Sequence, residues 1–154
     1  MLELGDAAPD FSLEDGDGNT WRLADLKGQK VILYFYPADN TPGCTKESCD
    51  FRDASADLRK AGYIVLGVSP QGAESHQRFA AKYSLNFPLL VDEDLALARA
   101  YGAYKERGDY KGIPLRVLRS TFVIDEGGRI EIAEYGVKAA GHVERLQAQL
   151  GVSV

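Results

Sequence analysis

Hydrophobic residues are concentrated in short runs that are typical of the strands of a central sheet. Residues 30–36 and 63–69 are almost unbroken apolar runs, rich in β-branched and aromatic residues, as expected for strands covered on both faces. Residues 87–91 predict a third core strand. Residues 121–125 and 130–135 flank the turn sequence Glu-Gly-Gly-Arg and predict a β-hairpin.

Between these runs, hydrophobic residues recur at spacings of three and four, which indicates amphipathic helices. The predicted helices cover residues 45–60, 74–83, 95–101 and 141–150. Asp92-Glu-Asp94 precedes the third helix and can cap its N-terminus.

The N-terminal segment predicts a small hairpin. Residues 10–14 and 20–22 show strand patterns on either side of Asp-Gly-Asp-Gly-Asn. That acidic run lacks the closing glutamate of a calcium loop and is interpreted as a turn. Residues 23–27 predict one short helical turn, whereas residues 104–118 predict no regular element.

The order of these elements predicts one α/β domain spanning residues 1–154. Strands alternate with helices between two hairpins, and a helix closes the chain. This order is typical of a three-layer fold in which a mixed parallel and antiparallel sheet carries helices on both faces.

Composition and charge restrict the classes of function. The 154 residues carry a net charge of −5 and have a pI of about 5.0, which argues against a nucleic-acid partner held through its phosphates. No apolar run is long enough to span a membrane, and the acidic start does not resemble a secretory leader. We therefore expect a cytoplasmic protein, in which the two cysteines favour catalysis or metal binding over a structural disulfide.

Both cysteines follow the first core strand. Residues 37–43 contain the Pro, Asp, Asn and Gly of a loop, and the helical pattern starts at Thr45. Cys44 is thus expected where a loop opens a helix. The free N–H groups at a helix N-terminus carry partial positive charge and can convert such a cysteine into a nucleophilic thiolate.

The spacing of Cys44 and Cys49 does not allow a disulfide while both residues lie on one continuous helix. On one continuous helix their Cα atoms would be about 8.6 Å apart, beyond the limit of roughly 7 Å for a disulfide. If the two residues bond, at least the first helical turn must unwind.

Several cysteine chemistries do not fit. Cys-x-x-Cys is absent, and Asp50 stands where a cysteine phosphatase needs arginine. A zinc site or a Cys–His nucleophile needs a nearby histidine. His76 and His142 lie far from Cys44 in sequence and are expected to face solvent or to end helices, so no metal site is predicted. Inert buried thiols remain an alternative.

The surroundings of Cys44 favour a small polar substrate with an O–O bond. Thr41 offers a hydroxyl, although it could also be a turn residue or a helix cap. Gly43 lets backbone N–H groups approach a substrate closely. Pro37 can keep water from the sulfur. Arg119 could place a positive charge beside the thiolate, a surface ion pair being its alternative role.

These residues resemble the peroxiredoxin signature Pro-x-x-x-Thr-x-x-Cys, which residues 37–44 match. Cys49, in Thr-x-Glu-x-Cys, resembles the PrxQ branch, also called bacterioferritin comigratory protein. The likeness extends nearly end to end. Tyr104 stands where tryptophan is common, and residues 112–119 are longer than usual, which leaves Arg116 as a weaker rival of Arg119. The supporting segments are residues 5–11, 67–70, 75–76, 79–83, 87–92 and 119–125.

The resemblance implies a thioredoxin-like fold and a thiol peroxidase that reduces hydrogen peroxide and organic hydroperoxides. Cys44 matches the peroxidatic cysteine, which becomes a sulfenic acid. Cys49 matches the resolving cysteine, which forms a disulfide with Cys44. Thr41 and Arg119 match residues that hold the peroxide, and Glu47 matches a positioning glutamate.

The resemblance also implies a monomer that is recycled by thioredoxin or a similar dithiol, without metal, haem or flavin. The alternative function is a non-enzymatic peroxide sensor or a redox-switched binding module that uses the same cysteines once.

Overall fold

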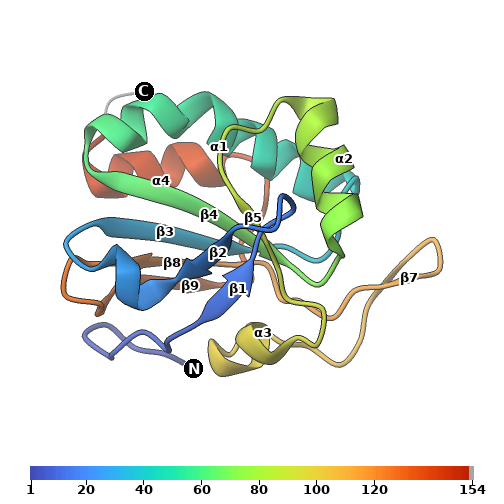
Figure 1. The fold of residues 1–154 in the computed structure, drawn as a ribbon, viewed down its shortest axis with the longest axis horizontal. Helices are drawn as coiled ribbons and strands as arrows, with labels where there is room; N and C mark the ends of the chain where they lie inside the picture. The colour runs from blue at the N-terminus through green and yellow to red at the C-terminus, as the bar shows by residue number, and fades with distance from the viewer. Residues whose placement is uncertain (153–154) are drawn as a thin grey trace.

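The computed structural model describes residues 1–152, in which five strands form one mixed sheet (Figure 1). The strands are β3 (Lys30–Phe35), β4 (Tyr63–Ser69), β5 (Leu89–Val91), β8 (Ser120–Ile124) and β9 (Ile130–Tyr135). Their order is β5-β4-β3-β8-β9. β3, β4 and β5 are parallel, and β8 is antiparallel to both of its neighbours. The strand that leads to Cys44 therefore lies at the centre of the sheet.

The remaining elements surround this sheet. The helices are α1 (Pro42–Lys60), α2 (Ala73–Tyr83), α3 (Ala96–Ala100) and α4 (His142–Leu150), and Leu23–Leu26 form a 3-10 turn. One small hairpin pairs β1 (Ser12–Glu14) with β2 (Thr20–Arg22), and a second pairs β6 (Asp109–Tyr110) with β7 (Ile113–Pro114).

Successive residues of β3 contribute to opposite faces of the sheet, as the strand period requires. Ile32 and Tyr34 pack in a buried cluster with residues of α1, α2 and α4. Leu33 and Phe35 pack in a second cluster with the N-terminal segment and α3. The predicted mixed sheet with helices on both faces and an N-terminal hairpin is thus confirmed.

Two local predictions need correction. α1 begins at Pro42, not at Thr45, because proline suits the first position of a helix, where its missing N–H is not needed. Cys44 therefore lies within the first turn of the helix. Residues 104–118, for which no element was predicted, contain the β6–β7 hairpin, which projects from the body of the protein (Figure 1).

The proposed acidic cap before the third helix is confirmed. Asp92 accepts hydrogen bonds from the backbone N–H groups of Leu97 and Ala98, and Asp94 accepts one from Ala96. The helix that they cap is shorter than predicted and ends at Ala100.

Gly67 in β4 explains how a large side chain fits opposite it. Gly67 pairs with Tyr34 of β3. A Cβ atom at Gly67 would lie 2.8 Å from Leu89 Cδ2 and 3.0 Å from the Tyr34 hydroxyl oxygen. Glycine weakens most strands, but here it makes the space that the Tyr34 ring occupies.

We expect Gly67→Ala to lower the free energy of unfolding by about 1–3 kcal/mol, because the extra methyl group overpacks the core. Urea denaturation measures the loss. Gly127→Ala is the matched control, since its added Cβ would meet nothing closer than 3.5 Å, and a change within about 0.5 kcal/mol is expected. Equal losses in both variants would contradict the role given to Gly67.

Candidate active site

A buried loop connects β3 to α1. Pro37, Ala38 and Asp39 are all buried. The Thr41 hydroxyl donates a hydrogen bond to the Ala38 carbonyl oxygen at 2.8 Å and does not cap α1. Asn40 adopts a left-handed conformation with φ of 64°, which asparagine tolerates better than most residues. The loop is therefore held in one shape by its own contacts.

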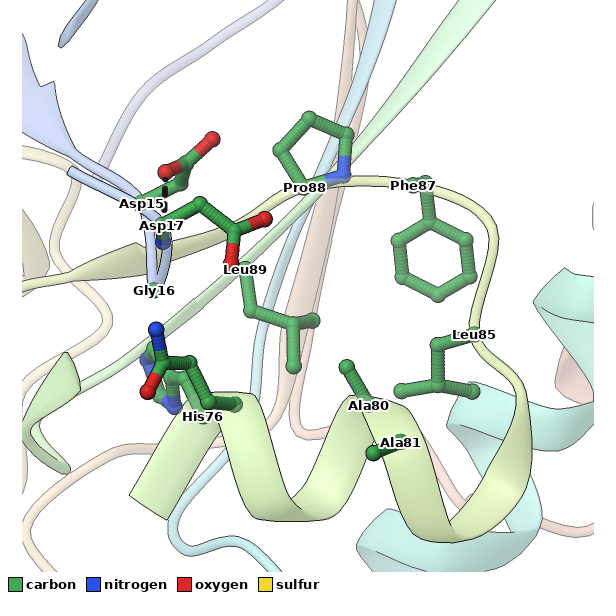
Figure 2. A pocket seen from close by; sticks show the side chains of 11 residues that line it. Asp15, Gly16, Asp17, His76, Ala80, Ala81, Leu85, Phe87, Pro88 and Leu89 are labelled. Atoms are coloured by element: carbon green, nitrogen blue, oxygen red, sulfur yellow. Dashed lines mark hydrogen bonds between the residues drawn. The ribbon is translucent and has the colours of Figure 1, made fainter. Parts of the chain in front are cut away.

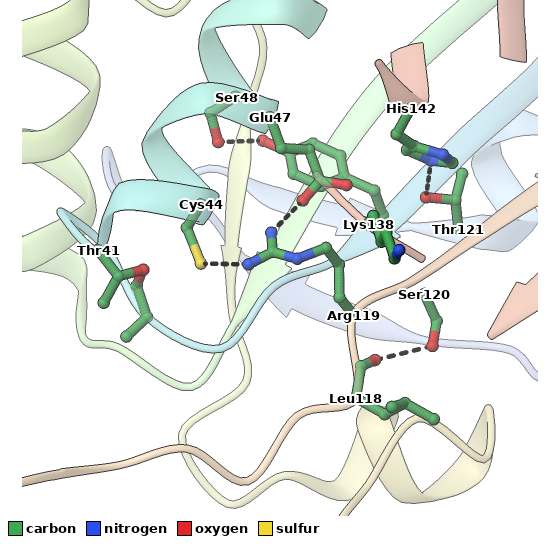
Figure 3. Close-up of polar contacts among 12 residues, drawn as sticks. Thr41, Cys44, Glu47, Ser48, Leu118, Arg119, Ser120, Thr121, Lys138 and His142 are labelled. Atoms are coloured by element: carbon green, nitrogen blue, oxygen red, sulfur yellow. Dashed lines mark hydrogen bonds and ion pairs between the residues drawn. The ribbon is translucent and has the colours of Figure 1, made fainter. Parts of the chain in front are cut away.

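Cys44 lies at the start of α1 and is 1% exposed. Arg119 Nη2 donates a hydrogen bond to Cys44 Sγ at 3.3 Å (Figure 3). The helix N-terminus and the guanidinium both stabilise negative charge on the sulfur. A Cβ atom at Gly43 would lie 3.1 Å from Arg119 Nη2, so this glycine also makes room for the guanidinium.

Arg119 joins Cys44 to Glu47. Its Nη1 donates to Glu47 Oε1 at 2.6 Å, and the Glu47 side chain is 0% exposed. Burial disfavours the charged guanidinium, but Glu47 and Cys44 outweigh burial and raise the pKa of Arg119 above its ordinary value. The ion pair is therefore an internal one, and the alternative role of Arg119 in a surface ion pair does not apply.

Glu47 has one oxygen atom, Oε2, without a hydrogen-bond partner among residues 1–152. Burial raises the pKa of Glu47 from 4.5 to about 7, although Arg119 acts in the opposite direction. The short contact with Arg119 alone would favour the carboxylate, but the loss of hydration of a fully buried group is the larger effect. Glu47 therefore changes its charge near neutral pH.

Cys49 lies on the same helix, is partly buried and is not bonded to Cys44. α1 is continuous across both residues, which places their Cα atoms about 8.6 Å apart. Since a disulfide needs less than about 7 Å, this is the dithiol form, in which the helix is intact and the two thiols are apart.

A polar network beneath the loop was not predicted. Asp39 accepts hydrogen bonds from the Tyr36 hydroxyl at 2.6 Å and the Ser75 hydroxyl at 2.7 Å. His76 Nδ1 lies 2.7 Å from Asp39, and its Nε2 lies 2.9 Å from the Leu90 carbonyl oxygen. This network ties the loop that leads to Cys44 to α2 and to the Leu90 backbone of β5.

His76 is 1% exposed, so the expectation that it faces solvent is wrong. A signal was available in the sequence. His76 precedes Phe79, Ala80 and Tyr83 by three, four and seven positions, which places all four on one face of a helix. The spacing therefore indicates that His76 lies on the buried face of α2, although histidine is a polar residue.

His142 begins α4, in agreement with one of the two expected positions, but it is also buried. Its Nε2 lies 2.8 Å from the Thr121 hydroxyl oxygen (Figure 3), and burial lowers the pKa of His142. Neither histidine forms a hydrogen bond to Cys44. Within residues 1–152, no three His, Cys, Asp or Glu side chains are grouped so that they could hold a metal ion.

Arg116, the rival of Arg119, lies elsewhere. Its Nη1 donates to the Gly108 and Leu115 carbonyl oxygens of the projecting hairpin. Of the two arginines, Arg119 is the one that contacts the sulfur.

A cavity of about 300 Å³ lies outside this site, between the β1–β2 turn, α2 and the segment that leads into β5 (Figure 2). Asp15, Asp17, His76, Ala80 and Leu89 are among the residues that line it. Cys44 does not line this cavity.

Comparison with known proteins identifies the family. Residues 4–133 match the AhpC/TSA family. The chain belongs to this family. A putative peroxiredoxin from Mycobacterium tuberculosis is 51% identical over 151 residues, covering 98% of this chain and 96% of the relative. Peroxiredoxin Bcp from Bacillus subtilis is 42% identical over 147 residues, covering 95% of this chain and 94% of the relative.

Solved structures of similar proteins agree with this assignment. A peroxiredoxin Q mutant from Xanthomonas campestris superposes with a TM-score of 0.87 at 40% identity, covering 98% of this chain and 96% of that one. A PrxQ mutant from Xylella fastidiosa gives 0.89 at 33% identity, with the same coverage. The thioredoxin-like fold and the likeness to the PrxQ branch are confirmed.

The pKa of Glu47 predicts a pH-dependent stability. With a pKa of about 7 in the folded chain and 4.5 in the unfolded chain, Glu47 binds its proton more tightly when folded. Its contribution to stability is complete below pH 4.5 and is lost as the pH rises through 7, by at most about 1.4 kcal/mol per pH unit.

Urea denaturation between pH 4.5 and 8 tests this on the wild type and Glu47→Gln. We expect the free energy of unfolding of the wild type to fall with pH relative to the variant. Glu144→Gln, at an exposed position of α4, controls for the removal of a carboxyl group. If the free energy of unfolding changed with pH in the same way in the wild type and in Glu47→Gln, folding would not raise the affinity of Glu47 for its proton.

Proposed function

We propose that Cys44 is the nucleophile of this thiol peroxidase and that it reduces hydrogen peroxide and organic hydroperoxides. The chain is a peroxiredoxin of the PrxQ type, an enzyme that takes a peroxide as substrate and a thiol as reductant. A bacterioferritin comigratory protein from Xanthomonas campestris, with a TM-score of 0.86 to this chain, is described in terms of its alkyl peroxide reduction activity. The observation that carries the proposal is the contact of 3.3 Å between Arg119 and the buried sulfur.

In the first step the Cys44 thiolate attacks the terminal oxygen of the peroxide. An S–O bond forms, the O–O bond breaks, and water or an alcohol leaves after it takes up a proton, so Cys44 becomes a sulfenic acid. Arg119 and the Thr41 hydroxyl are proposed to hold the peroxide oxygens. The N–H groups of Gly43 and Cys44 have no partner within the helix and can do the same.

Two further residues support this step. Glu47 orients the Arg119 guanidinium through the contact of 2.6 Å. Pro37 is buried at the start of the loop and is proposed to limit the access of water to the sulfur. Glu47 and Pro37 are thus proposed to shape the site, and neither is proposed to stabilise the charge that develops on the peroxide.

In the second step the Cys49 thiol attacks the Cys44 sulfenic acid. Water leaves and a disulfide forms, for which α1 must unwind between the two residues because its folded geometry keeps them apart. A dithiol then reduces the disulfide by exchange. We infer that thioredoxin supplies this dithiol, since a pair of thiols returns both cysteines to the reduced state.

The remaining inferences concern the setting of the enzyme. We infer one domain over residues 1–154 that works as a monomer in the cytoplasm, because both cysteines of the cycle lie on one helix and the cycle needs a steady supply of reductant. Metal, haem and flavin have no step in it. No helix within residues 1–152 has the length and apolar character to cross a membrane.

Replacing each cysteine tests the cycle. NADPH consumption with thioredoxin, thioredoxin reductase and hydrogen peroxide should continue over many turnovers in the wild type and be absent in Cys44→Ser. With thioredoxin as the reductant, Cys49→Ser should consume one equivalent of peroxide and then stop. Turnover by Cys44→Ser would refute the assignment, and one disulfide per chain without turnover would favour a sensor.

Replacing Arg119 tests the charge at the sulfur. Arg119→Met should lower the second-order rate constant of Cys44 oxidation by about 10²–10³-fold, as expected for the loss of a preorganised donor. Competition against a second peroxidase measures this constant. Arg116→Met is the matched control and should react at the wild-type rate; an equal loss in both variants would assign the effect to net charge.

A further inference from the structure

A buried hydrogen bond links the central sheet to the helix segment that carries Cys49. The hydroxyl groups of Tyr34 and Ser48 lie 2.8 Å apart, and both side chains are 0% exposed. Burial holds the pKa of Tyr34 well above its ordinary value, so the phenol keeps its proton. Ser48 directly precedes Cys49 and lies one turn after Cys44 on α1 (Figure 3).

Tyr34 cannot follow α1 when the helix moves. Its strand is paired with β4 on one side and β8 on the other. Its ring lies over Gly67, at 3.0 Å from the position of a Cβ atom, and stacks on Phe51 at 4.5 Å. Ser48 is the one hydrogen-bond partner of the Tyr34 hydroxyl among residues 1–152. If α1 unwinds, Ser48 gains water but Tyr34 loses its partner.

Two buried polar contacts oppose unwinding between Cys44 and Cys49. One is the pair of Glu47 and Arg119, which also serves the peroxide step. The other is the Tyr34–Ser48 hydrogen bond, in which neither side chain is hydrogen-bonded to the side chain of Cys44 or Arg119. Only the second can alter the unwinding of α1 without removing a group from the site of peroxide reduction.

We propose that the Tyr34–Ser48 hydrogen bond is a brake on disulfide formation. It keeps α1 folded around Cys44 while the peroxide reacts, and it must break before Cys49 can reach the sulfenic acid. Tyr34 and Ser48 are thus positioning residues that set how long the sulfenic acid persists. A longer lifetime allows a second peroxide to oxidise Cys44 to the sulfinic acid, with release of water or an alcohol. This inference rests on the proposed function of Cys44 and Cys49.

Tyr34→Phe removes the bond and leaves the ring in place. The net contribution of a buried neutral hydrogen bond corresponds to a factor of about 3–10 in the folding of the segment. We expect disulfide formation to be faster by that factor after one equivalent of hydrogen peroxide, as followed by rapid thiol alkylation and intact mass. The rate of Cys44 oxidation should be unchanged, and the peroxide concentration that gives half-maximal sulfinic acid should rise in proportion.

Tyr101→Phe is the matched control. The Tyr101 hydroxyl donates to the Pro9 carbonyl oxygen at 2.7 Å and belongs to the cluster on the opposite face of the sheet. Its loss should lower overall stability without changing the rate of disulfide formation. Ser48→Ala should accelerate the disulfide as Tyr34→Phe does, and the two effects should be less than multiplicative, since both remove one bond.

A second measurement needs no peroxide. In the reduced protein, backbone amides of residues 47–53 should exchange hydrogen about 3–10-fold faster in Tyr34→Phe than in the wild type, whereas amides of β4 should not. A wild-type rate of disulfide formation in Tyr34→Phe, or an equal acceleration in Tyr101→Phe, would refute the brake. Failure of the wild type to form any disulfide would instead refute the proposed role of Cys49.

Discussion

The candidate active site depends on one buried positive charge. A guanidinium inside a protein is stable only if it is paired and hydrogen-bonded, and Arg119 meets this condition by contacting Cys44 on one side and Glu47 on the other. The sheet brings these groups together. The end of β3 pairs with the start of β8, Phe35 opposite Ser120, so the loop that leads to Cys44 meets the residue that precedes Ser120.

α1 combines two kinds of attachment in one helix. Its later turns place Leu58 and Ala54 in the apolar core, where burial favours the helix strongly. Its first turns add buried polar contacts, that of Glu47 with Arg119 and that of Ser48 with Tyr34 of β3. Water can replace hydrogen bonds more readily than it can replace apolar packing. One helix therefore has a fixed end and an end that can be released.

Much of the fold could be predicted because residues on the buried face of a strand or helix recur with a regular spacing in the sequence. The apolar runs of β3 and β4 and the spacing in α1, α2 and α4 identified the layers. The first turn of α1 was missed since its Pro-Gly pair is also typical of a loop, and the β6–β7 hairpin was missed because two-residue strands carry no periodicity. Pro37, Thr41, Gly43 and Cys44 formed a local motif that the sequence displays directly.

Contacts between distant segments could not be predicted from the sequence alone. The sequence favours Arg119 over its weaker rival Arg116, but only the register of β3 and β8 brings Arg119 beside Cys44. His76, expected to face solvent or to end a helix, is buried because Asp39 and the Leu90 carbonyl oxygen satisfy its ring nitrogens, and both partners are distant in the sequence. The Tyr34–Ser48 hydrogen bond depends on the space left by Gly67, which no local pattern reveals.

The pair of Asp39 and His76 has a consequence for the electrostatics of the loop. His76 Nε2 faces a carbonyl oxygen, which only accepts hydrogen bonds, so this nitrogen carries a hydrogen. Nδ1 faces Asp39, and a hydrogen lies between them either on the ring or on the carboxyl group. The first case is an imidazolium with a carboxylate, and the second is a neutral ring with a carboxylic acid. Both sum to zero net charge, so the pair anchors the loop and contributes a dipole, but no net charge, to its surroundings.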